Sequence, residues 1–122
     1  YGGLEHRAST ALLAARRELP RPGMPAGDAG YQRLLGLISH EYFHAWNVKR
    51  LAPAELAAPD LQREAYTRLL WWFEGVTSYY DDLVLVRAGL VTPERYLELL
   101  ASHAVAVAAQ PGRQVQSVAQ SS

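Results

Sequence analysis

Apolar residues recur at a helical spacing in three stretches of this chain. The first stretch predicts a helix over about residues 29–47, with Asp28 as its N-cap, and the second predicts a helix over about residues 66–88. The third predicts a helix over about residues 93–109, with Thr92 as its N-cap and a proline in the first helical position. We expect the apolar face of this third helix to lie in the core: Tyr96, Leu97, Leu99, Leu100, Val105 and Val107.

Glycine and proline interrupt this pattern elsewhere. They predict a loop over residues 19–30 and a crossing loop over residues 51–64. Residues 9–13 predict a short strand or an extended edge, and the glycine pair at residues 2–3 predicts either a tight turn or a backbone that lies close to another group. The predicted fold is therefore mainly α, with a short N-terminal strand as its β component.

Three residues in or after the first two helices have structural interpretations. Gly75 lies inside the second predicted helix, where glycine costs about 1 kcal/mol relative to alanine, so we expect it to permit close packing. Lys49 and Arg50 follow the first helix, and we interpret them as solvated cations that compensate the dipole at its C-terminal end.

The composition narrows the class of protein. The chain has 122 residues, the size of one domain, and it begins with tyrosine, so we expect a piece of a longer protein. Its formal net charge is zero, which argues against nucleic acid as a partner, and its apolar runs are shorter than the roughly 20 residues of a membrane helix. The lack of cysteine excludes disulfides, thiolate zinc ligands and a cysteine nucleophile. It fits a bacterial cytoplasm and a periplasm equally well.

The first predicted helix carries the motif His40-Glu41-Tyr42-Phe43-His44, of the form His-Glu-x-x-His. Two histidines four residues apart lie on one helical face, so both imidazoles can reach one metal ion. Glu41 lies one step round the helix, where a general base can take a proton from water at the metal. Apolar neighbours predict a largely buried helix, in which His and Glu are costly unless they are paired or bind a metal. The motif therefore predicts a catalytic Zn²⁺ site.

A catalytic zinc ion takes three protein ligands, so a third must come from elsewhere in the chain. The position six residues after His44, where another histidine would indicate a metzincin, is Arg50. We prefer Glu74, because its aromatic neighbours should desolvate the carboxylate and a bound cation would stabilise its charge. Glu64 competes, at a spacing near that of aminopeptidase N-type enzymes. The full set of candidates is Glu55, Asp60, Glu64, Glu74, Asp81, Asp82 and His103.

Two pairs of residues that follow Glu74 have both a functional and a structural explanation. A hydroxyl of Tyr79 or Tyr80 near the metal could donate to the oxyanion of a tetrahedral intermediate, and core packing would explain either tyrosine alone. Asp81 and Asp82 could orient a ligand histidine through its second ring nitrogen, or they could be ordinary surface acids.

Together these residues resemble the glycyl aminopeptidase family of bacterial zinc metallopeptidases. Four segments carry the resemblance, and with their spacing they cover essentially the whole chain: Gly2–His6, Ser39–Arg50, Glu74–Leu83 and Pro111–Ser122. The segment around the histidine motif is highly specific. The resemblance implies the helical part of a thermolysin-like (gluzincin) catalytic domain over residues 1–122. The family's N-terminal β-rich domain and C-terminal PDZ domain would then lie outside this chain.

The resemblance also implies roles for individual residues and an activity. Glu5 lies in a Gly-Gly-Leu-Glu segment that is similar to the exopeptidase motif of aminopeptidase N-type enzymes, so it would receive the free amino group of a peptide substrate. The implied activity is that of a zinc-dependent aminopeptidase that favours small N-terminal residues such as glycine. The implied site comprises His40, His44 and Glu74 as zinc ligands, Glu41 as general base, and Tyr79 or Tyr80 as transition-state donor.

Two other functions fit the same residues. In a zinc endopeptidase, Glu5 would be merely structural, and replacing it would barely affect dipeptide cleavage. In a non-catalytic interaction domain, the metal site would survive as structure, although a scaffold has no need of Glu41. The chain by itself could also be inactive, because we expect part of the cleft wall to lie outside it.

Overall fold

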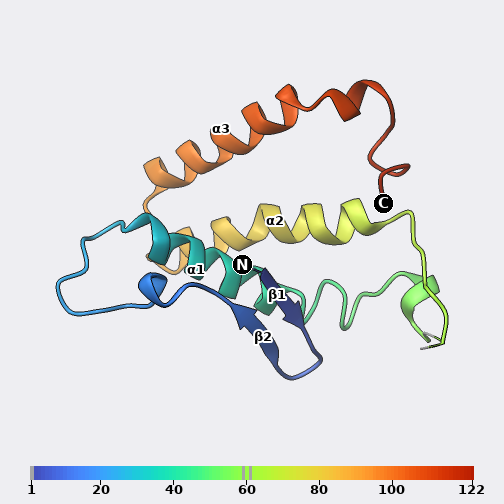
Figure 1. Ribbon diagram of the computed structural model, residues 1–122, viewed down its shortest axis with the longest axis horizontal. Coiled ribbons are helices and arrows are strands. Elements are labelled where there is room, and N and C mark those ends of the chain that lie inside the picture. The colour runs from blue at the N-terminus through green and yellow to red at the C-terminus, as the bar shows by residue number, and fades with distance from the viewer. Residues whose placement is uncertain (1, 59, 61) are drawn as a thin grey trace.

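A computed structural model describes residues 2–58, 60 and 62–122, so two residues of the predicted crossing loop, Pro59 and Leu61, lie outside the described part. Figure 1 shows α1 and α2 packed together, with the hairpin beneath α1 and α3 arching over α2. The predicted, mainly helical fold with a short N-terminal β component is confirmed. The described elements are β1 (Gly2–Glu5), β2 (Thr10–Leu13), α1 (Ala29–Phe43), α2 (Leu70–Arg87) and α3 (Pro93–Ala109), with 3-10 turns at Arg16–Glu18, Ala54–Leu56 and Pro111–Gln114.

The N-terminal hairpin places a strand directly against the motif helix. β1 and β2 are antiparallel, and Gly2 pairs with Leu13. The strand predicted over residues 9–13 is confirmed, whereas the glycine pair lies in a strand and forms no turn. The alternative prediction, a backbone that lies close to another group, is confirmed, since a methyl group placed on Gly3 would overlap the carboxylate of Glu41. Glycine at this position therefore lets the backbone approach the motif without displacing the side chain of Glu41.

Helix α1 begins where its capping signal predicts and ends earlier than its apolar pattern predicts. The Asp28 carboxylate accepts a hydrogen bond from the amide of Tyr31 at 2.9 Å, as an N-cap does. The last helical residue is Phe43, short of the predicted Asn47. The ring of His44 contacts the carbonyl oxygen of Asn47 through Nδ1 at 2.9 Å, which requires that carbonyl to leave the helical direction.

The two cations after α1 are only partly as predicted, because Arg50 is exposed whereas Lys49 is half-buried and has a carboxylate partner. Lys49 and Arg50 lie in turns beyond the last helical residue. The guanidinium of Arg50 packs over the ring of Trp46 at 5.9 Å from its centroid, and the ammonium of Lys49 pairs with the carboxylate of Glu5.

Helix α2 begins at Leu70, a turn later than predicted, and ends close to its predicted end. Helix α3 has its predicted cap, because Thr92 accepts a hydrogen bond from the amide of Arg95 at 3.2 Å. Gly75 does not permit close packing as predicted: a methyl group placed there would meet nothing within 4 Å.

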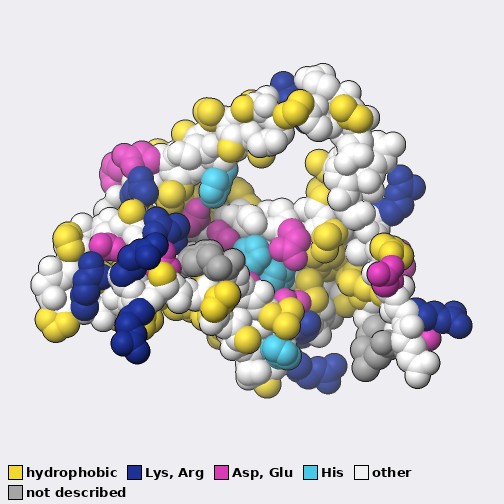
Figure 2. Space-filling model, in the orientation of Figure 1, with side chains coloured by type: hydrophobic (Ala, Val, Ile, Leu, Met, Phe, Trp, Pro, Cys, Tyr) yellow, Lys and Arg dark blue, Asp and Glu magenta, His cyan; other side chains and the backbone are white. Residues whose placement is uncertain are grey.

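The prediction that α3 contributes a core face is also wrong. Leu97 and Val105 are 61% and 68% exposed. The helix contacts the rest of the chain near its start, where Arg95 Nε donates to Gln32 Oε1 at 3.0 Å, and it then diverges from α2. Figure 2 shows the resulting opening between α3 and α2. Periodicity predicts which face is apolar, but not whether a partner covers it.

Polar groups organise the interior between α1 and α2. Asn47 Nδ2 donates to the carbonyl oxygen of Phe73 at 3.0 Å and to Thr77 Oγ1 at 3.1 Å. Thr77 donates to the same carbonyl at 2.6 Å and is fully buried. These bonds tie the turn after α1 to the second turn of α2, and they surround the ring of His44, which is 2% exposed.

We expect Asn47→Ala to lower the free energy of unfolding by about 1–3 kcal/mol, because it leaves the buried hydroxyl of Thr77 without its donor. Urea denaturation followed by circular dichroism measures this difference. Gln62→Ala, at an exposed position of the crossing loop, is the matched control and should change stability by no more than about 0.5 kcal/mol. Equal stability of the two variants would contradict the role assigned to Asn47.

Candidate metal centre

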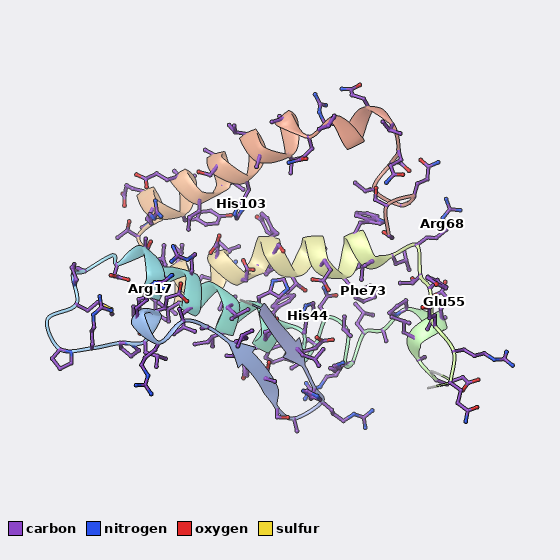
Figure 3. All side chains as sticks on the ribbon, in the orientation of Figure 1. Arg17, His44, Glu55, Arg68, Phe73 and His103 are labelled. Carbon is purple, nitrogen blue, oxygen red and sulfur yellow. The ribbon has the colours of Figure 1, made fainter. Side chains whose placement is uncertain are left out.

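Three ligand-type side chains converge where the end of α1 faces the start of α2. His40 lies in the last turn of α1, His44 is its C-cap, and Glu74 lies in the second turn of α2. The Nε2 atoms of the two histidines are 3.1 Å apart. Glu74 Oε2 lies 3.2 Å from Nε2 of His40 and 3.6 Å from Nε2 of His44. Figure 3 shows the labelled His44 between the two helices.

The dimensions of this triangle fit a tetrahedral zinc ion. Nitrogen and oxygen ligands at about 2.1 Å from a tetrahedral ion lie about 3.4 Å from one another. The three separations, 3.1, 3.2 and 3.6 Å, bracket that value. The separations among the three atoms are therefore close to those of ligands around one such ion.

Hydrogen bonds at the other ring nitrogens direct both imidazoles. Nδ1 of His40 lies 3.0 Å from Asp81 Oδ2, and Nδ1 of His44 lies 2.9 Å from the Asn47 carbonyl oxygen. Because a carboxylate and a carbonyl only accept, both Nδ1 atoms carry the hydrogen, and Nε2 of each neutral ring presents a lone pair. Glu74 also presents lone pairs, so three acceptors face one another, an arrangement that only shared protons or a cation can stabilise.

The convergence of these three side chains, without an ion between them, shifts the pKa values of His40 and Glu74. Hydrogen bonds that the His40 ring donates to the carboxylates of Asp81 and Glu74 raise the pKa of His40 to about 10, against the effect of burial. Hydrogen bonds from His40 and His44 lower the pKa of Glu74 to about 2. Protons therefore take the place of the cation, and a metal ion must displace them to bind.

The environment of Glu74 differs from the predicted one. Its side chain is 48% exposed, and its neighbours Trp71 and Trp72 are 42% and 45% exposed, so the carboxylate is desolvated only in part. The two imidazoles hold the carboxylate. The physical reason for preferring Glu74 therefore holds only in part, yet the structure brings this residue to the two histidines.

The other candidate ligands lie elsewhere. The carboxylate of Glu64 accepts a hydrogen bond from the hydroxyl of Tyr66 in an exposed loop. Asp81 contacts the far nitrogen of His40, which is the orienting role considered for it. Among the described residues, the group that could hold a metal is His40, His44 and Glu74. The remaining candidates do not join it: Glu55, Asp60, Asp82 and His103.

Glu41 and Glu5 lie beside this cluster. Glu41 is 7% exposed and packs against the backbone at Gly3. Burial raises the pKa of the Glu41 carboxyl, and the nearby Glu5 and Glu74 carboxylates act in the same direction, against the two histidines. Glu5 Oε1 forms an ion pair with Lys49 Nζ at 3.0 Å. A proton acceptor and a second carboxylate thus flank the three ligand-type residues.

Neither predicted tyrosine joins the site. Tyr80 stacks on Phe43 with ring centroids 5.2 Å apart and an interplanar angle of 10°. Tyr79 is 52% exposed and interacts with Tyr96. Within the described part of the chain, no hydrogen bond joins either hydroxyl to the three candidate ligands. The two tyrosines lie five and six residues after Glu74 and therefore off its helical face.

Sequence reasoning missed two residues at this site. Asn47 directs the ring of His44 through its backbone and ties α1 to α2 through its side chain, and Lys49 pairs with Glu5. No spacing rule identifies either residue, because the partner of each one, Phe73 for Asn47 and Glu5 for Lys49, comes from a distant part of the chain. For Asn47, a polar residue just after an apolar motif helix was the available signal.

The helical fold thus brings together three side chains of a kind that could hold a metal ion. A model of the M61 glycyl aminopeptidase family matches residues 33–122. The chain therefore belongs to the M61 glycyl aminopeptidase family, and the resemblance found in the sequence is confirmed. Comparison with curated proteins gives no significant match.

A crystal structure of an aminopeptidase N family protein from Idiomarina loihiensis is similar to this chain, with 47% sequence identity and a TM-score of 0.78. The match covers 82% of this chain and 17% of that protein, so the chain spans about a sixth of the length of its relative. In the described residues, no helix combines the length and apolar character needed to cross a membrane.

Proposed function

We propose that this chain carries the zinc site of an aminopeptidase that hydrolyses the first peptide bond of peptides with a free N-terminus, favouring small first residues such as glycine. The observation that carries the proposal is the triangle of His40, His44 and Glu74, whose lone-pair atoms have tetrahedral spacing. Family membership supports a peptidase, and the residue types at the site support zinc.

Each residue around the triangle has a chemical task. Held by the two histidines and Glu74, a zinc ion would polarise the scissile carbonyl and acidify a water molecule. Glu41 takes a proton from that water and passes it to the leaving amine, and its raised pKa suits both steps. Glu5 binds the substrate ammonium and so limits cleavage to the first residue.

Hydrolysis of glycine p-nitroanilide and of its N-acetylated counterpart tests the proposal. We expect the protein to cleave the free amine substrate, to lose activity on dialysis against a chelator and to regain it with zinc. Equal cleavage of both substrates would indicate an endopeptidase. Bound zinc without cleavage of either substrate by the full-length protein would favour the non-catalytic interaction domain.

The endopeptidase remains a second candidate because of one contact. Glu5 already has a cationic partner in Lys49, so its charge is partly satisfied before any substrate binds. If Glu5 only anchors the hairpin, then Glu5→Gln leaves the ratio of the two cleavage rates unchanged. A fall in that ratio supports the aminopeptidase.

We expect Asp81→Asn to weaken zinc binding about 10–100-fold, because Asp81 fixes the tautomer and orientation of His40. Competition with a chromophoric chelator measures this affinity. Asp82→Asn removes the adjacent carboxylate, which lies outside the cluster, and should leave the affinity unchanged. The same loss in both variants would indicate a general effect of negative charge.

A further inference from the structure

An ion pair joins the strand that carries Glu5 to the turn that follows α1. Glu5 is the last residue of β1, and Lys49 lies beyond the end of the motif helix. Lys49 Nζ and Glu5 Oε1 are 3.0 Å apart, and their side chains are 28% and 20% exposed. Both groups are more buried than the partners of an ordinary surface ion pair, so solvent competes less for this contact.

Lys49 helps to keep the carboxylate of Glu5 charged in this half-buried position. Burial raises the pKa of that carboxyl. The backbone amide of Glu5 and the ammonium of Lys49 lower the pKa by more than burial raises it, so the net shift is downward. The charged groups that act on Glu5 include His44, and Glu5 in turn acts on Glu41. The pair therefore lies within electrostatic reach of the candidate metal centre.

The pair also fixes geometry. A glutamate side chain at the end of a two-stranded hairpin has three rotatable bonds, and Lys49 restrains one of its oxygens. The same strand lies on Glu41 through Gly3, so a tether between Glu5 and the turn after α1 also sets the position of the strand over the general base.

We propose that Lys49 is a positioning residue for the recognition of the substrate amino group. It holds Glu5 Oε1, keeps the carboxylate beside Glu41, and leaves the remaining acceptor capacity of that carboxylate for a peptide ammonium. This inference rests on the proposed function, in which Glu5 receives the N-terminus.

Binding of glycinamide and N-acetylglycinamide to the zinc-loaded protein tests the inference. Binding is measured by a chemical-shift titration with each probe, and wild type is compared with Lys49→Met, Lys49→Arg and Glu5→Gln. We expect Lys49→Met to weaken glycinamide binding about threefold to tenfold, Lys49→Arg to restore most of it, and the acetylated probe to respond to neither. Zinc content should be equal in all four proteins, because neither side chain belongs to the candidate ligand set and the contact between Lys49 and His44 is made by the backbone amide of Lys49, which every variant keeps.

A second measurement needs no metal. In a carbon-13 titration of the Glu5 carboxyl, Lys49→Met should raise its pKa and Lys49→Arg should not. An unchanged pKa in Lys49→Met would overturn the inference, because the pair would then be absent in solution. Lys49→Gln, which keeps a hydrogen-bond donor without the charge, replaces the Met variant if circular dichroism shows that the latter is unfolded.

The two proposals fail in different ways. If Glu5→Gln leaves glycinamide binding unchanged, the ammonium role of Glu5 is wrong and the proposed function loses its basis for a free N-terminus. If Glu5→Gln weakens binding but Lys49→Met does not, the proposed function stands and the role of Lys49 is wrong. Tighter glycinamide binding in Lys49→Met would show that Lys49 competes with the substrate, which also overturns the inference.

Discussion

Glu74→Ala is expected to abolish zinc binding, while Glu64→Ala retains about one zinc ion per chain, as in wild type. The carboxylate of Glu74 lies 3.2 and 3.6 Å from the Nε2 atoms of His40 and His44, whereas Glu64 accepts a hydrogen bond from the hydroxyl of Tyr66. Loss of a residue that only orients a ligand weakens metal binding about 10–100-fold, so loss of a ligand should cost more than about 100-fold. Elemental analysis after gel filtration measures the number of zinc ions bound per chain.

Two controls show whether a loss of zinc by Glu74→Ala comes from the missing ligand and not from unfolding. Glu74 is half exposed, so its removal leaves no buried cavity, and circular dichroism should show an unchanged fold. Glu74→Gln keeps the shape and one oxygen but removes the charge, and it should bind zinc weakly. If Glu64→Ala loses the ion and Glu74→Ala keeps it, the third ligand proposed here is wrong. If wild type binds none, the metal centre itself is contradicted.

The parts of this site that the sequence predicts are those governed by helical periodicity. Two histidines four residues apart on a helix must share a face, so the spacing alone pairs His40 with His44. The spacing also places Glu41, which lies one residue after the first histidine and therefore about 100° round the helix from it. Caps are equally local, which explains why the sequence identifies Asp28 and Thr92 correctly as N-caps.

The parts that escape prediction depend on packing between distant segments. Glu74 can be ranked from the sequence but not placed, because its exposure depends on what covers α2. The apolar face of α3 is predicted to be buried, and it lies open because the helix diverges from α2. The pairing of Lys49 with Glu5 depends on the position of the hairpin, which no local rule specifies.

Glu41→Gln should separate catalysis from metal binding. We expect zinc content equal to that of wild type and cleavage of glycine p-nitroanilide reduced by about 10²–10⁴-fold, the usual contribution of a general base. Glutamine has nearly the same volume, so the contact with the backbone at Gly3 is kept while the proton acceptor is lost. Alanine would also open a void under β1 and would confuse the two effects.

Tyr79→Phe and Tyr80→Phe are the matched controls for this variant. Each removes a hydroxyl from an aromatic side chain that packs against another ring, and both tyrosines lie on α2 off the helical face of Glu74. We therefore expect both variants to cleave the substrate at close to the wild-type rate. A loss as large as that of Glu41→Gln in either one would mean that a tyrosine reaches the transition state after a conformational change. Full activity in Glu41→Gln would instead exclude proton transfer by the one carboxylate that the motif buries beside the site.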